Sequence, residues 1–117
     1  MHELSVASAV VDTVLRHADD RRVLVVTLKV GQMRQVIPDS LAFYFDIVTR
    51  DTLVEGARLE QVVVPARMRC GACAHEWEPE LMFRCPECSG TGEVIAGDEL
   101  EVDSIEVEED SECIASR

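Results

Sequence analysis

The sequence predicts a small α+β fold with two helices, about three strands, and a cysteine-rich module inserted between the second and third strands. Apolar residues recur at helical intervals in two segments and alternate in others, as in half-buried strands. Between residues 69 and 92 these patterns give way to Cys, Gly and Pro. We therefore expect a discontinuous domain of residues 1–67 and 96–112, a separate module at 68–95, and a flexible tail at 113–117.

The first helix is predicted for about residues 3–18. Its apolar residues recur every three or four positions and form one stripe, consisting of Leu4, Ala7, Val11, Val14, Leu15 and Ala18. The polar sequence HADDRR ends this helix. His17 lies near the end of the helix, where a cation complements the helix dipole, so we assign it a structural role.

A half-buried strand follows in the sequence VLVVTLKV, and Gly31 closes it. One side of this strand carries Leu24, Val26, Leu28 and Val30. The second helix begins at Pro38, which suits the first turn, and runs to about Arg50. Asp39 suits the positive end of its dipole. Its apolar stripe consists of Leu41, Tyr44, Phe45 and Val48.

Two more strands complete the predicted sheet. After a turn at Gly56, the sequence RLEQVVVPA predicts a strand that Pro65 stops. Beyond the cysteine-rich module, DELEVDSIEVEE alternates again, and we expect this strand to rejoin the first sheet. Its apolar residues change phase near Asp103 and Ser104, which indicates a bend or bulge there.

Composition narrows the classes of function. The chain has 117 residues and a net charge of −12, with 23 acidic and 11 basic residues, which disfavours binding to nucleic acid. Ten acidic residues and no basic one lie between Glu93 and Glu112, a pattern typical of a solvated face. Residues 1–15 lack Lys and Arg, and no apolar run is long enough to span a membrane, so we expect a cytoplasmic protein.

Four cysteines have the spacing of a zinc ribbon. The sequences CGAC and CPEC, separated by eleven residues, supply Cys70, Cys73, Cys85 and Cys88. Four thiolates form a closed tetrahedral shell that suits structural zinc and leaves no open position for chemistry. Iron in the same shell, as in a rubredoxin, is the alternative, and a disulfide or redox pair is a third. Colour separates iron from zinc.

Other polar and aromatic residues near the cysteines receive structural roles. A closed shell does not need His75, and Trp77 is expected to pack over the ribbon as its small core. Cys113 is expected to be a free thiol in the tail. No nucleophile, general base or phosphate loop stands out, so the sequence does not predict an enzyme.

The opening residues, MHE, carry a second set of metal donors. The amine of Met1, the amide nitrogen of His2 and the His2 Nδ1 can chelate one ion in adjoining rings, and Glu3 is placed to supply a further donor. Planar nitrogen donors favour Ni(II) or Cu(II). Taken alone, however, a histidine near a terminus is ordinarily a solvated residue.

The chain contains the following segments in this order: MHELSVASAV, LKVGQM, IPDSLAFYFDIVT, EGARLE, the CGAC and CPEC pair, and GDELEVDSIEVE. Taken together, these segments resemble the HypA/HybF family of hydrogenase nickel-incorporation proteins. The resemblance covers about residues 1–109. It implies that His2 is the nickel-site histidine, that Met1 and Glu3 adjoin it, and that Cys70, Cys73, Cys85 and Cys88 bind zinc.

The resemblance also implies a function. Proteins of this family take up Ni(II) and pass it, with a partner GTPase, into the large subunit of [NiFe]-hydrogenase, and some relatives also serve urease and its accessory proteins. No catalytic residues carry over. The alternative is a zinc-ribbon module that recruits a protein partner without handling nickel; a rubredoxin-like electron carrier is a third class.

Overall fold

The computed structural model describes residues 2–79 and 83–109. The predictions for Met1 and for the tail at 113–117, with Cys113, lie outside these residues. The chain divides into two compact units. The first comprises Met1–Leu28, Val36–Gln61 and Glu101–Arg117. The second comprises Lys29–Gln35 and Val62–Leu100, so a short segment of the N-terminal half belongs with the cysteine-rich segment.

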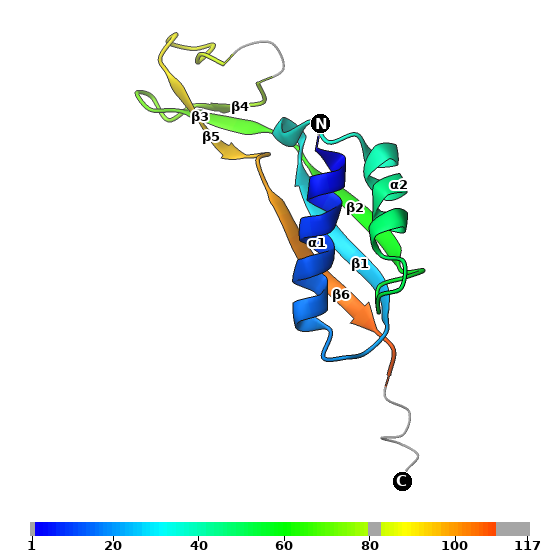
Figure 1. Cartoon of the computed structure of the whole chain (residues 1–117). Helices are drawn as coiled ribbons and strands as arrows, with labels where there is room; N and C mark the ends of the chain where they lie inside the picture. Colours follow the sequence, from blue (N-terminus) through cyan, green and yellow to red (C-terminus); the bar gives the residue numbers. More distant parts are fainter. Residues whose placement is uncertain (1, 80–82, 110–117) are drawn as a thin grey trace. The chain divides into compact units, whose positions relative to one another are not determined.

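Two helices and two three-stranded sheets make up the fold (Figure 1). The α-helices are α1 Glu3–His17 and α2 Pro38–Val48. The first sheet has the order β2-β1-β6 and consists of β1 Val23–Gly31, β2 Arg58–Val64 and β6 Leu100–Val107. The other has the order β4-β3-β5 and consists of β3 Arg67–Cys70, β4 Glu76–Trp77 and β5 Gly92–Ala96. The α+β prediction, with the last strand rejoining the first sheet, is confirmed. The strands of the second sheet were not predicted from the sequence.

Both α-helices lie on the same face of the first sheet and contact each other (Figure 1). Within α2, Leu41 and Phe45 are buried as predicted, and Pro38 occupies the first turn. The predicted stripe of α1 was partly wrong, because Leu4 and Leu15 are 50% and 36% exposed. The buried face is rotated around the helix axis, and its apolar members are Val6, Ala7, Val10, Val11 and Val14.

The strands β1 and β6 follow the predicted alternation, with one change at the start of β1. Leu24 is 44% exposed, and Val23 is buried in its place. In β6 the half-buried positions are Leu100, Val102, Ile105 and Val107, so the predicted phase change at exposed Asp103 and Ser104 is confirmed. The Glu108 N–H donates to the Arg22 carbonyl at 2.8 Å, which joins the end of β6 to the start of β1. These two strands therefore run antiparallel.

Within the second unit, the segment around the 3₁₀ helix η1 (Gln32–Arg34) is bound to later parts of the chain. The Met33 N–H donates to the Gly97 carbonyl at 2.8 Å, and the Ala66 N–H donates to the Gln32 Oε1 at 2.9 Å. Gly97 has a φ of +102°, and a Cβ there would lie 2.4 Å from the Ala66 Cα. Only glycine fits this crossing of chain segments without a steric clash.

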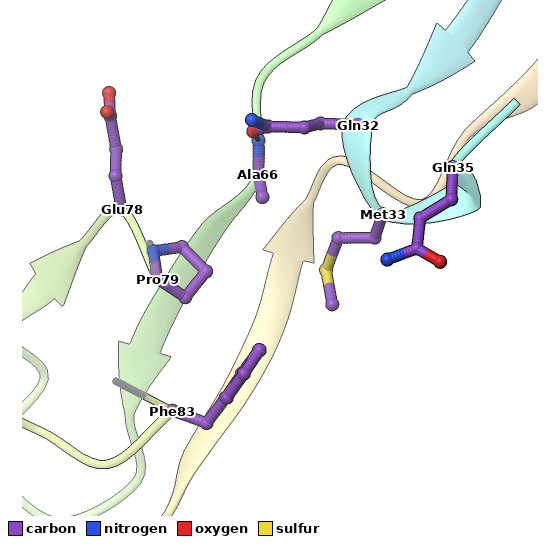
Figure 2. A pocket seen from close by; sticks show the side chains of 7 residues that line it. All are labelled: Gln32, Met33, Gln35, Ala66, Glu78, Pro79 and Phe83. Carbon is purple, nitrogen blue, oxygen red and sulfur yellow. Dashed lines mark hydrogen bonds between the residues drawn. The ribbon is translucent and has the colours of Figure 1, made fainter. Parts of the chain in front are cut away.

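A hollow of about 260 Å³ opens beside this crossing (Figure 2). The side chains of Met33, Pro79 and Phe83 point toward one another across it, while Gln32 turns toward Ala66. Phe83 is 58% exposed. The hollow is lined by Gln32, Met33, Gln35, Ala66, Glu78, Pro79 and Phe83.

Candidate metal centres

The cysteine pairs form two turns with the same backbone hydrogen bonds. In the first, the Cys70 N–H donates to the His75 carbonyl at 2.8 Å, and the Ala74 N–H donates to the Cys70 carbonyl at 3.1 Å. The second turn repeats both bonds at the same spacing. There the donors are Cys85 N–H, to the Gly90 carbonyl at 3.0 Å, and Ser89 N–H, to the Cys85 carbonyl at 2.8 Å.

Each turn depends on one residue in the left-handed region. Ala74 has a φ of 63° and Ser89 a φ of 62°, and each directly follows the second cysteine of its pair. This conformation reverses the chain so that both thiols of a pair face the same point. Gly90 leaves room for the sulfurs, because a Cβ there would lie 3.0 Å from the Cys70 Sγ and 3.2 Å from the Cys88 Sγ.

The two turns bring all four predicted cysteines together. Their sulfur atoms lie within 4.8 Å of one another. Cys70 Sγ lies 3.5 Å from Cys88 Sγ, while Cys73 Sγ lies 3.7 Å from both Cys85 Sγ and Cys88 Sγ. A tetrahedron with metal–sulfur bonds of about 2.3 Å has sulfur–sulfur edges of about 3.8 Å. The cluster therefore fits a tetrahedral ion bound by four thiolates.

The electrostatics of the cluster also favour a bound cation. Hydrogen bonds from the N–H groups of Cys73 and Ala72 lower the pKa of the Cys70 thiol to about 6. A hydrogen bond from the Gly90 N–H lowers the pKa of Cys88, but hydrogen bonding to the Cys70 and Cys73 thiols outweighs it and raises that pKa to about 12. Four neighbouring thiols do not ionise together unaided, and a metal ion supplies the compensating charge.

Trp77 packs against the sheet that carries the first cysteine pair. It lies opposite Met68 in the β3–β4 pairing, and a Cβ at Gly92 would lie 2.6 Å from the Trp77 ring. The His75 ring stacks on the Trp77 ring, with 6.1 Å between centroids and 8° between planes. The described residues include a single group of three or more potential metal ligands, the four cysteines, and His75 is not in it.

The predicted nickel residues lie at the start of α1. His2 is exposed, precedes the helix as its N-cap residue, and makes no side-chain capping hydrogen bond. Glu3 is only 6% exposed, and its Oε2 accepts a hydrogen bond from the Ile37 N–H at 3.1 Å. The pKa of the Glu3 carboxyl is lowered to about 2, and the hydrogen bond from the Ile37 N–H contributes to this shift. The Glu3 side chain therefore helps to join α1 to the residue before α2.

Sequence reasoning missed two features of these centres. It did not identify Ala74 and Ser89, although the equal offset of these residues from the two cysteine pairs is visible in the sequence. Nor did it find the bond between Glu3 and Ile37, because the two residues are 34 positions apart and a glutamate in a first helical turn is usually exposed. His17 is where it was expected, with its Nδ1 2.9 Å from the Thr13 carbonyl.

Comparison with known proteins decides the family. The model of the family described as "Hydrogenase/urease nickel incorporation, metallochaperone, hypA" matches residues 1–107. The chain belongs to the HypA family. This confirms the resemblance found in the sequence, and it confirms that the chain is a metallochaperone-type maturation factor rather than an enzyme.

HypA relatives cover nearly the whole chain. The hydrogenase maturation factor HypA of Geobacter metallireducens is 44% identical over 110 residues, which are 92% of this chain and 100% of that protein. HypA of Streptomyces avermitilis is 42% identical over 116 residues, 93% of this chain and 88% of that protein.

Solved structures share the fold. The solution structure of the Ni metallochaperone HypA from Helicobacter pylori matches with a TM-score of 0.68 at 24% identity and covers 92% of this chain and 97% of that chain. In the described part of this chain, no helix is long and apolar enough to cross a membrane.

Proposed function

We propose that this protein binds Ni(II) at its N-terminus and delivers it during maturation of [NiFe]-hydrogenase. The observation that carries the proposal is that residues 1–107 match a nickel-incorporation family. The matched segment includes the sequence MHE at residues 1–3. The amine of Met1, the amide nitrogen of His2 and the His2 Nδ1 form adjoining chelate rings around one ion. Such planar nitrogen coordination suits Ni(II).

Glu3 adjoins this set and supplies its backbone nitrogen or its carboxylate. The hydrogen bond from Ile37 to its carboxylate supports the backbone nitrogen as the donor, because the side-chain oxygen already has a partner. In this arrangement the carboxylate positions the start of α1, and nickel keeps exposed faces. An acceptor protein then exchanges its own ligands for these nitrogens.

The four cysteines hold zinc in this proposal, in a module of residues 68–95 within the domain formed by 1–67 and 96–112. Their sulfur–sulfur distances of 3.5 to 3.7 Å support a tetrahedral ion. When bound, zinc supplies a closed structural centre and takes no part in chemistry. Elemental analysis tests this assignment: one zinc per chain supports it, whereas iron and visible colour would contradict it.

Partners follow from the family's role in hydrogenase maturation. We expect a nickel-inserting GTPase and the hydrogenase large subunit to bind this chain in the cytoplasm, with urease accessory proteins as a further class. The net charge of −12 supports partners other than nucleic acid. Co-purification of the GTPase and the large subunit with this chain would test these assignments.

A calorimetric Ni(II) titration of the zinc-loaded protein with its native N-terminus tests the nickel site. The titration is repeated with His2→Ala and with a form that carries one extra residue before Met1. His17→Ala is the matched control, because His17 is an exposed histidine at the other end of α1. We expect submicromolar, near-stoichiometric binding that is lost in the first two variants and retained in the control.

Equal binding in all four proteins, or binding in none, would contradict the nickel site. It would favour a zinc-ribbon module that recruits partners without handling nickel. Protons provide a second test, because they compete for the amine and the imidazole, whose ordinary pKa values are about 7.7–8.0 and about 6.5. Both donors bind nickel in their deprotonated forms, so the affinity should fall as the pH falls through this range.

A further inference from the structure

The strand β6 lies at an edge of the first sheet. In the order β2-β1-β6, its one neighbour within the described residues is β1. Eight residues long, β6 therefore has an outer side whose backbone N–H and C=O groups meet no strand within the described residues. Such an edge pairs readily with another strand of suitable length and charge.

A hollow of about 240 Å³ lies between β6 and α1. Its apolar lining consists of Val14, which is fully buried, and half-buried Val102 and Ile105, and Asp103 and Ser104 also line it from β6. Thr13 and His17 border it from the helix. Figure 1 shows α1 running alongside this edge of the sheet. An apolar side chain that enters this hollow would approach the edge strand and the helix together.

The charge of the edge selects what can pair with it. Glu101, Asp103 and Glu106 are all exposed along β6, and no basic residue occurs between Glu93 and Glu112. Pairing of β6 with a second copy of itself would bring like charges together, which is destabilising. A strand with basic residues would instead gain opposite-charge contacts on the same surface.

We infer that β6 binds a basic, extended segment of a partner protein as a fourth strand. The segment's backbone bonds to the outer edge of β6, one apolar side chain enters the hollow between α1 and β6, and its basic side chains meet the acidic row. This is a peptide-recognition surface distinct from the two metal centres, and it does not depend on the nickel proposal. Main-chain bonds supply affinity in such complexes, and the side-chain hollow supplies specificity.

Three short peptides test the inference by NMR titration of the zinc-loaded full chain. The probe is acetylated, amidated KVKIKV, which alternates basic and apolar residues. EVEIEV keeps the apolar residues and reverses the charge. KVPIKV keeps two lysines but lacks one N–H group, because proline cannot donate to a sheet ladder. We expect KVKIKV to bind at least about 10-fold more tightly than either control.

The position of binding separates strand addition from general attraction to an acidic surface. With KVKIKV, amide shifts should concentrate at residues 101–107 and 13–17, and cross-strand NOEs should join the peptide to β6. The double variant Glu101→Lys with Glu106→Lys should lose the preference for KVKIKV and bind EVEIEV instead. A matched control, Asp12→Lys with Asp46→Lys, makes the same change in net charge at exposed helix positions and should keep the preference.

Four results would overturn the inference. One is equal binding of KVKIKV and KVPIKV, because strand addition needs the N–H group that proline lacks. Another is a set of shifts spread over all acidic surfaces without NOEs to β6. The third is unchanged binding in the Glu101→Lys and Glu106→Lys protein with its fold intact. Absence of any binding at millimolar peptide would show that the acidic row only protects the edge from pairing.

Discussion

Replacing Ala74 or Ser89 with glycine should stabilise the second unit. Both residues have φ angles just above 60°, a conformation that costs an L-amino acid about 1–2 kcal/mol. Glycine adopts it without this cost but loses about 0.5–1 kcal/mol more conformational entropy on folding. Both side chains are exposed, so little packing is lost. The net gain should be about 0.5–1 kcal/mol at each position.

Trp77 makes the measurement local, because it is the single tryptophan of the chain and lies in the second unit. Denaturant unfolding at a fixed free zinc concentration, followed by Trp77 fluorescence, reports the free energy of unfolding of this unit. Ala74→Gly and Ser89→Gly should raise the midpoint. Ala72→Gly is the matched control. Ala72 lies between Cys70 and Cys73, its side chain is exposed, and its φ angle is not positive.

Glycine at position 72 should therefore lower the free energy of unfolding by about 0.5–1 kcal/mol and move the midpoint to a lower denaturant concentration. The contrast in sign between the control and the two test variants is the decisive result. If all three glycine variants were destabilised alike, the left-handed residues would not be strained, and the account of the two cysteine turns would be refuted.

Further predictions concern both units. The pKa of Glu3 is about 2 in the folded protein, against an ordinary value of 4.5. Its carboxylate therefore stabilises the fold above pH about 4.5, and this stabilisation is lost as the pH falls toward 2. Glu3→Gln should make the helical circular dichroism less sensitive to acid. Gly97→Ala should unfold or rearrange the second unit, whereas Gly56→Ala, at a similar positive φ but with nothing within 4 Å, should cost only about 1–2 kcal/mol in calorimetry. Removal of zinc by a chelator should change Trp77 fluorescence but leave the helical circular dichroism, because both α-helices belong to the first unit. A loss of both signals together would contradict independent folding of the first unit.

The sequence was sufficient for the elements whose patterns are strong and local. Pro38 and the stripe through Leu41 and Phe45 located α2, and the spacing of the cysteine pairs identified four residues that the fold brings together. In α1, by contrast, apolar residues surround more than half of the helix. Periodicity could not choose between Leu4 and Val6, because that choice depends on how the helix packs on the sheet.

Contacts distant in sequence could not be predicted. The buried carboxylate of Glu3 accepts a hydrogen bond from the Ile37 N–H, and no sequence pattern near Glu3 indicates this partner. Short strands were also missed: in β3, Met68 and Cys70 are buried between exposed or half-buried arginines, an alternation of only four residues. Patterns this short do not distinguish a strand from a loop.

The matching hydrogen bonds of the two cysteine turns have a consequence for the order in which the centre assembles. Each turn is closed by contacts within six residues, so either pair can form as a local two-sulfur chelate before the other is in place. Bringing in the second pair then closes a loop of eleven residues between Cys73 and Cys85, a step with a modest entropic cost. Metal should therefore enter in two kinetic stages and leave by the reverse route, with a half-bound, exchangeable intermediate between them.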